Sequence, residues 1–146
     1  ARSLIEESLV IGEQTQNIFI RTQGYVGLGE AEYNDGHLDA ALTYYYKALS
    51  AYDTEDAPLG MILFALTGIA RIKIEQGEPQ EALRLVTLVL RYPPSFIGMI
   101  EERANKMLNE LTERLNQDMI SETLAQTKSL ILRQVVTDLL AQEQNG

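Results

Sequence analysis

The residues of this chain that could carry out acid–base or metal chemistry are few and far apart in sequence. His37 is the only histidine, and cysteine is absent. Carboxylates cluster at Glu6–Glu7, at Asp53, Glu55 and Asp56, and at Glu101–Glu102. Such pairs can act as general acid and base, but acids also favour the starts and polar faces of helices, and no second ligand is spaced to bind a metal with His37. We therefore expect no catalytic residue, no cofactor and no metal.

A glycine-rich run, Gly24-x-x-Gly27-x-Gly29, is the candidate for a phosphate-binding loop. The Lys-Ser/Thr pair of a phosphate loop does not follow it, and no predicted strand precedes it. Both the order of the residues and their context are therefore wrong for a nucleotide site, and we do not expect one here.

The charge balance argues against nucleic acid as a partner. The net charge is −9, from 21 acidic and 12 basic residues, and such a surface repels phosphate backbones. The basic residues in the middle of the chain are scattered: Arg71, Lys73, Arg84, Arg91, Arg103 and Lys106. No apolar run approaches the roughly 20 residues that span a bilayer. We expect a folded cytoplasmic protein that binds neither nucleic acid nor membrane.

The elements that must position all of these residues carry one pattern twice, about forty residues apart. The first copy is Tyr25, Leu28, Gly29, Gly36, Ala41, Tyr45 and Ala48. The second copy is Leu66, Ile69, Ala70, Gly77, Ala82, Val86 and Val89, and Pro94 follows it. Self-similarity at such a period is typical of a helical repeat array.

Small residues in the pattern predict close helix crossings. Gly29 or Ala70 on the first helix of each pair is expected to meet Ala41 or Ala82 on the second, while Tyr45 and other large residues fill the remaining space. Because one hairpin cannot bury both of its apolar faces, neighbouring hairpins must stack. We predict an all-α fold of stacked antiparallel helix hairpins, with about seven to eight helices.

Apolar spacing at helical period predicts helices over 3–13, 15–34, 38–52, 58–76, 79–91 and 96–115, and a helical tail over 118–142. Gly36 and Gly77 are expected to end helices in the left-handed conformation. Two prolines in the segment Tyr92–Ser95 predict a break, and we expect another near Lys128–Ser129. We divide the chain into helical repeats over 1–116 and C-terminal capping helices over 117–146.

The chain resembles the tetratricopeptide repeat family. The aromatic-x-x-Leu-Gly, small and aromatic positions of that family are met by Tyr25-Val26-Gly27-Leu28-Gly29 and by Ala41, Tyr45 and Ala48. Pro94 stands where the terminal proline of the family falls. The second copy departs from the family at Ala70 and Val89, and the spacing of 41 is longer than the usual 34.

That longer spacing is similar to the repeat arrays at the C-terminal end of large bacterial signal-transduction ATPases and transcriptional regulators. Ser8–Leu9 precedes Ala48–Leu49 by forty residues, so the first segment is expected to be the second helix of a repeat that lacks its first. We therefore expect the chain to be a C-terminal fragment of a larger regulator.

In the tetratricopeptide repeat family, ligands usually lie along the concave surface made by the first helix of each pair. The resemblance implies contact positions at Gln23, Val26, Glu30, Tyr33, Asn34, Phe64, Thr67, Arg71 and Glu75. Members that bind chaperone tails have a lysine and an asparagine where this chain has Val26 and Glu30, so we expect no carboxylate clamp.

The function that follows from the pattern and the resemblance is that of a non-catalytic interaction module or scaffold. Its partner would be a protein, a peptide or other domains of the parent protein. One alternative is a homo-oligomer, such as a homodimer, in which the C-terminal helices pair with a second copy. A second alternative is an enzyme with an all-helical active site, although no nucleophile, base and metal ligand converge in the sequence.

Overall fold

The computed structural model describes residues 2–54, 57–92 and 98–145. These residues form eight α-helices and one 3₁₀ helix, and no strand occurs among them: α1 Arg2–Thr15, α2 Ile18–Asn34, α3 Leu38–Leu49, η1 Ser50–Asp53, α4 Leu59–Glu75, α5 Pro79–Leu90, α6 Gly98–Arg114, α7 Gln117–Thr127 and α8 Leu132–Asn145. The predicted all-α class and the helix count are confirmed. Within the same residues, no helix is both long and apolar enough to cross a bilayer.

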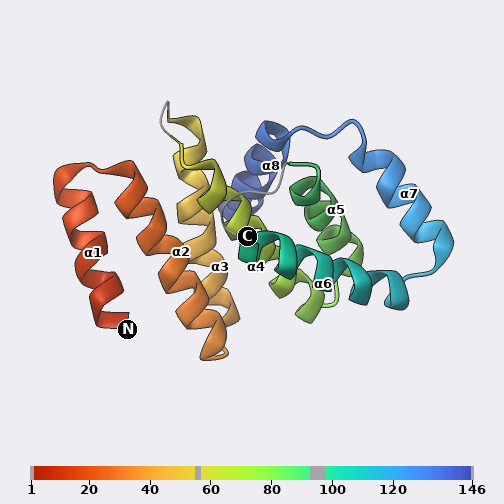
Figure 1. Cartoon of the computed structure of the whole chain (residues 1–146), viewed down its shortest axis with the longest axis horizontal. Helices are drawn as coiled ribbons and strands as arrows, with labels where there is room; N and C mark the ends of the chain where they lie inside the picture. The colour runs from red at the N-terminus through yellow and green to blue at the C-terminus, as the bar shows by residue number, and fades with distance from the viewer. Residues whose placement is uncertain (1, 55–56, 93–97, 146) are drawn as a thin grey trace.

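The helices stack as antiparallel hairpins from α1 at one end of the molecule towards α7 at the other (Figure 1). Each of the helices α1 to α5 packs against the next one along the chain. Helices two positions apart along the chain also touch, because α4 packs against both α2 and α6. This second set of contacts places α2, α4 and α6 along one face of the stack.

Two glycine turns close the hairpins. Gly36 has φ +82° between α2 and α3, and Gly77 has φ +80° between α4 and α5. No atom lies within 4 Å of a side-chain carbon built at either position, so the left-handed backbone is what requires glycine there. Both predicted helix stops are confirmed.

Helix boundaries agree with the predicted ones to within about three residues, and local hydrogen bonds explain the differences. The second helix begins at 18 rather than 15, because the Asn17 side chain caps it by accepting a bond from the Ile20 backbone at 3.0 Å. The third α-helix ends at Leu49, where the Ser50 hydroxyl donates to the Lys47 carbonyl at 2.6 Å, and η1 follows. Pro94 and the predicted start at 96 lie outside the described residues.

The C-terminal helices fold back over the stack. The predicted break is confirmed, since α7 ends at Thr127 and α8 begins at Leu132. α7 packs against α5, and α8 returns to α3 and η1. Arg91, just after α5, holds the α7–α8 turn by donating to the carbonyl oxygens of Thr127 at 2.7 Å and Leu130 at 2.8 Å.

The centre of the stack is built around Tyr45, and this corrects the expected crossing. A side-chain carbon at Gly29 would lie 2.7 Å from the Tyr45 ring, and one at Gly68 would overlap the same ring. Gly29 therefore makes room for Tyr45 rather than for Ala41. The ring lies between α2 and α4, where two glycines accommodate it.

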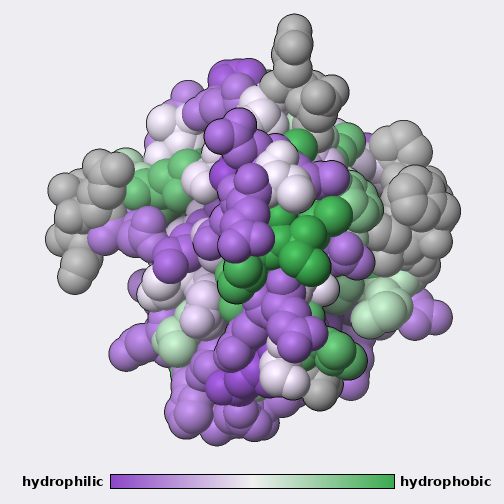
Figure 2. Space-filling model, turned by 90° about the vertical axis from the view of Figure 1, so that its left-hand side faces the viewer, coloured by the Kyte–Doolittle hydropathy of each residue, from purple (hydrophilic) through white to green (hydrophobic). Residues whose placement is uncertain are grey.

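Most residues predicted to pack the repeats are buried. These are Leu28, Gly29, Ala41, Tyr45, Ala48, Leu66, Ile69, Ala70, Ala82, Val86 and Val89. Tyr25 is half-buried and stacks on Tyr44 with ring centres 6.5 Å apart. Figure 2 views the end of the stack that α1 forms. Apolar atoms gather in the middle of this face, so this end is less completely covered by polar groups.

Candidate functional site

The described side chains that suggested acid–base chemistry lie apart from one another on the surface, and Glu55 and Asp56 lie outside the described residues. His37 is exposed in the α2–α3 turn, where its Nδ1 lies 2.7 Å from Glu32 Oε2. Asp53 forms an exposed ion pair with Arg133 at 3.0 Å. In the part of the chain that the structure describes, no three His, Asp or Glu side chains are grouped to hold a metal ion.

A different polar cluster joins four helices, and Glu30 of α2 is at its centre. Its Oε2 accepts hydrogen bonds from Arg71 Nη2 and Arg103 Nη1, each at 3.1 Å, and its Oε1 accepts one from Arg103 Nη2 at 2.5 Å. The Tyr45 hydroxyl donates to the same carboxylate. Charge-assisted and two-pronged bonds of this kind are among the strongest in proteins, so Glu30 fixes α3, α4 and α6 against α2.

Aromatic rings hold the two guanidinium groups from the other side. Arg71 lies 3.6 Å from the centre of the Tyr33 ring, and Arg103 lies 4.5 Å from that of Phe64. The side chains of Arg71 and Arg103 are only 23% and 17% exposed. Stacking and ion pairing together restrain both guanidinium groups.

The protonation states follow from this environment. Burial raises the pKa of Glu30, but hydrogen bonds from Arg103 and Tyr45 and the charges of both arginines outweigh it, so the pKa is lowered below the ordinary 4.5. Burial and the Glu75 carboxylate raise the pKa of Tyr33 to about 12. At neutral pH Glu30 is ionised, and one carboxylate faces two arginines.

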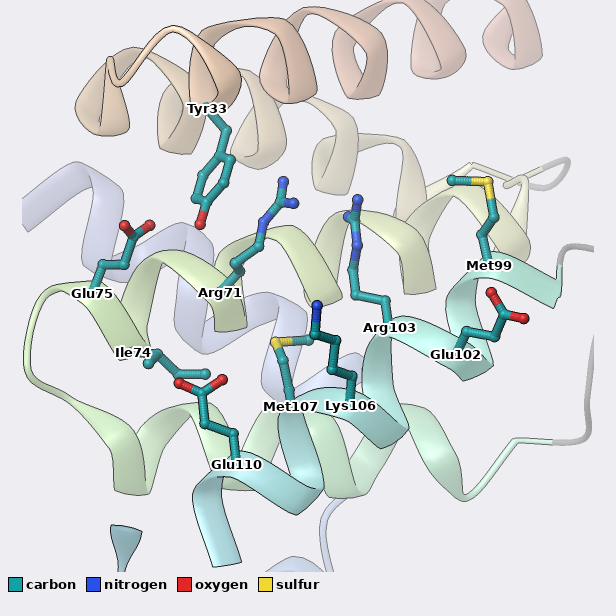
Figure 3. Close-up of a pocket in the computed structure, with 10 residues that line it drawn as sticks. All are labelled: Tyr33, Arg71, Ile74, Glu75, Met99, Glu102, Arg103, Lys106, Met107 and Glu110. Carbon is teal, nitrogen blue, oxygen red and sulfur yellow. The ribbon is translucent and has the colours of Figure 1, made fainter. Parts of the chain in front are cut away.

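A groove with a cavity of about 510 Å³ lies beside this cluster (Figure 3). Tyr33 of α2 and Arg71, Ile74 and Glu75 of α4 form one part of its lining. α6 contributes the rest: Met99, Glu102, Arg103, Lys106, Met107 and Glu110. Apolar side chains and charges of both signs therefore line the same surface.

Four of the nine predicted contact positions belong to this region. Tyr33, Arg71 and Glu75 line the groove itself. Glu30 lies next to it and holds Arg71 and Arg103 in place. The structure thus brings these side chains together from α2 and α4, the first helices of two pairs.

The other five positions do not line the groove, although Phe64 and Thr67 contact Arg103 beside it. Val26, Phe64 and Thr67 are buried, so they pack the helices rather than face a partner. Thr67 donates its hydroxyl to the Phe64 carbonyl at 2.7 Å. Gln23 lies in a separate groove between α1 and α2, and Asn34 is exposed at the end of α2.

The contribution of α6 was missed by the sequence reasoning, which treated the basic residues as scattered. In the structure Arg71, Arg103 and Lys106 line one groove. A signal was available in α6, where Met99, Arg103, Lys106 and Glu110 follow at intervals of four, three and four residues. Such spacing places all four on one face of a helix.

The glycine-rich run serves packing rather than phosphate binding. Side-chain carbons built at Gly24 and Gly27 would lie 3.2 Å from Leu9 and Ile5 of α1, and Gly29 adjoins Tyr45. All three glycines lie inside α2, so they let neighbouring helices approach closely.

Comparisons of the chain with models of protein families, with curated proteins and with solved structures find no match. The resemblance to tetratricopeptide repeats therefore rests on the residues of the two copies in the sequence.

Proposed function

We propose that the chain is a non-catalytic helical-repeat module of the tetratricopeptide type, which binds a protein or peptide segment in the groove of α2, α4 and α6. The observation that carries the proposal is the cavity of about 510 Å³ beside the Glu30–Arg71–Arg103 cluster. Its lining comes from α2, α4 and α6, which follow one another along one face, so the stack itself creates the site. A surface made of helices from separate hairpins is suited to recognising an extended segment.

The lining supports a peptide rather than a phosphate-rich ligand. Met99 is 57% exposed, and methionine adapts its shape to varied apolar side chains. Lys106, Glu75 and Glu110 offer charges of both signs around it. Fixed arginines beside an adaptable apolar surface favour a segment that carries one apolar anchor and flanking polar groups.

The wider setting is part of the same proposal. The repeat spacing of 41 supports membership of a larger bacterial signalling or transcription regulator that works in the cytoplasm. In such a protein the groove would hold either a separate partner or another domain of the parent chain.

A selection experiment tests the groove. A random library of peptides is panned against the intact chain, and dissociation constants are measured for the wild type and for Met99→Asp. Ile131→Asp is the matched control, because Ile131 is 61% exposed and lies between α7 and α8, outside the groove. We expect Met99→Asp to weaken binding at least tenfold and the control to change it less than about twofold. Failure to select any binder, or equal loss in both variants, would refute the proposal.

A further inference from the structure

The charges that line the α2–α4–α6 groove are sorted along its length. Six of its ten lining residues belong to α6, from Met99 to Glu110. The groove therefore follows this helix for about three turns, or roughly 16 Å at 1.5 Å per residue. Figure 3 shows basic side chains in the middle of this length and carboxylates towards both ends.

The middle of the groove carries an excess of positive charge. Arg71 and Arg103 share the carboxylate of Glu30, which compensates one of their two charges. Lys106 is exposed and adds another, and it forms no ion pair among residues 2–54, 57–92 and 98–145. In a chain whose net charge is −9, such a local excess favours an anionic group of a ligand at this place.

Carboxylates lie on both sides of this centre. Glu102 is exposed towards the Met99 end of the groove (Figure 3). At the opposite end Glu110 is about half exposed, and its ion pair with Arg114 spans 3.7 Å, so the pair is weak and the carboxylate can bind a ligand. The order of charges along α6 is thus acidic, basic, acidic.

The spacing of these charges matches an extended peptide. Lys106 is four residues from Glu102 and four from Glu110, so each carboxylate lies about 6 Å from the lysine along the helix axis. In an extended segment, side chains two residues apart point the same way and are about 6.6 Å apart. Three alternate side chains of such a segment can therefore face the three charges in register.

The width of the groove also favours an extended backbone. A cavity of about 510 Å³ that follows roughly 16 Å of helix is only about 6 Å across. A helix with its side chains is about 10–12 Å in diameter. An extended segment fits this width, whereas a helix would lie largely outside the groove.

We propose that the groove selects an extended segment with the pattern basic-x-acidic-x-basic, whose acidic side chain faces Lys106 and whose basic side chains face Glu102 and Glu110. This inference rests on the proposed function and names the class of its ligand. No five-residue stretch of the sequence carries the pattern, so a second copy of these residues does not supply it. The ligand is a peptide segment of that composition, and its complementarity to the groove is electrostatic.

The first test uses the peptides that are selected from the random library. Binders that Met99→Asp weakens should be enriched in basic-x-acidic-x-basic relative to the inverted pattern, acidic-x-basic-x-acidic. Binders without this enrichment would overturn the inference and leave the proposed function standing. Failure to select any binder would overturn both.

A charge exchange then tests the central contact. One selected peptide is measured on the wild type, on Lys106→Glu and on Lys128→Glu. Lys128 is the matched control, because it is exposed at the end of α7, lies outside the groove and undergoes the same change of charge. We expect binding to weaken at least about tenfold in Lys106→Glu and less than about twofold in the control. Lysine in place of the acidic residue of the peptide should restore binding to Lys106→Glu, and no restoration would overturn the inference.

A second exchange tests the register. Glu110→Lys should weaken the same peptide at least about threefold. Glutamate at one of the two basic positions of the peptide should restore binding to this variant, whereas glutamate at the other should not. Restoration from both positions, or from neither, would contradict an extended segment that lies along α6.

Discussion

Glu30 is a single carboxylate shared by two arginines and a tyrosine from three other helices. Its position in the second half of α2 gives it access to α3 and α4 at once, and Arg103 reaches it from α6. Because Arg71 and Arg103 are held by Glu30 rather than by solvent, they keep their orientation beside the groove. Glu30 thus contributes to the site without lining it.

Replacing Glu30 with glutamine removes the charge and leaves the shape nearly unchanged. Two poorly exposed guanidinium groups then lose their counter-ion, and we expect the free energy of unfolding to fall by about 2–4 kcal/mol. Urea denaturation measures the change. Glu110→Gln serves as the control, because the Glu110–Arg114 pair is about half exposed and should contribute less than about 1 kcal/mol. Equal effects of the two substitutions would show that the cluster is not held by charge.

The stabilisation by Glu30 depends on pH with a definite sign. Since the pKa of Glu30 is lowered in the folded chain, its contribution is complete above its ordinary value and is lost as the pH falls towards the folded pKa. The difference in unfolding free energy between the wild type and Glu30→Gln should therefore stay constant from about pH 7 to about pH 5 and shrink as the pH falls further. Denaturation at a series of pH values measures it, and a difference that stays constant below about pH 5 would contradict the assigned pKa shift.

Individual residues of the site could be predicted only within the two copies of the pattern, which include α2 and α4 but not α6. Glu30, Tyr33, Arg71 and Glu75 were predicted because the resemblance implies contact positions along the first helix of each repeat. Arg103 was not, because it follows Arg71 by 32 residues whereas the copies are 41 apart. Its convergence on Glu30 depends on how α6 packs against α4, which is a property of the folded stack.

At the scale of helices, close packing depends on which side chain meets each glycine. Gly68 and Gly27 occupy the same place in successive first helices. The neighbour of Gly68 is the Tyr45 ring, which Gly29 and Glu30 hold from other sides, whereas the neighbour of Gly27 is the half-buried Ile5. The same substitution should therefore have different consequences in α4 and in α2.

We expect Gly68→Ala to lower the free energy of unfolding by about 1–3 kcal/mol, because the new methyl group would overlap a ring that has no room to move. Gly27→Ala should be neutral or stabilising by up to about 1 kcal/mol, because alanine favours helix and the Ile5 side chain can shift towards the open groove. Thermal and urea denaturation of both variants test the pair. A larger loss in Gly27→Ala would contradict the assigned packing.

The helices themselves were largely predictable, since apolar period and glycine stops are local signals. The exceptions are also local but depend on single hydrogen bonds. The Asn17 cap delays α2, and the Ser50 hydroxyl ends α3 in favour of η1. A pattern of apolar residues does not reveal whether a polar side chain will bond to the backbone at a given place.

At the scale of the whole molecule, the stack should open from its α1 end. α1 has α2 as its main packing partner, whereas α4 packs against α2, α3, α5 and α6 and is buried almost continuously from Ile62 to Lys73. Stability in a repeat array is distributed among neighbours, so helices at an end unfold locally first. We expect amides of α1 to exchange with solvent faster than those of α4, as native-state hydrogen exchange would measure. Equal protection would indicate one fully cooperative unit.

The return of the tail was the least predictable feature of the whole fold. The sequence indicates two tail helices and the break between them, but the packing of α8 on α3 joins segments about ninety residues apart. Arg91 fixes the α7–α8 turn through two carbonyl oxygens. These contacts are made to backbone carbonyl groups of the turn, so the residue types in the turn do not predict them.

The central claim is that the α2–α4–α6 groove receives a peptide segment. Amide hydrogen exchange of the intact chain, with and without a peptide selected from the random library, tests it most directly. We predict slower exchange in the last turn of α4, around Arg71 to Glu75, and along α6 from Met99 to Glu110, with little change in α7 and α8. Protection confined to any other part of the stack would contradict the claim.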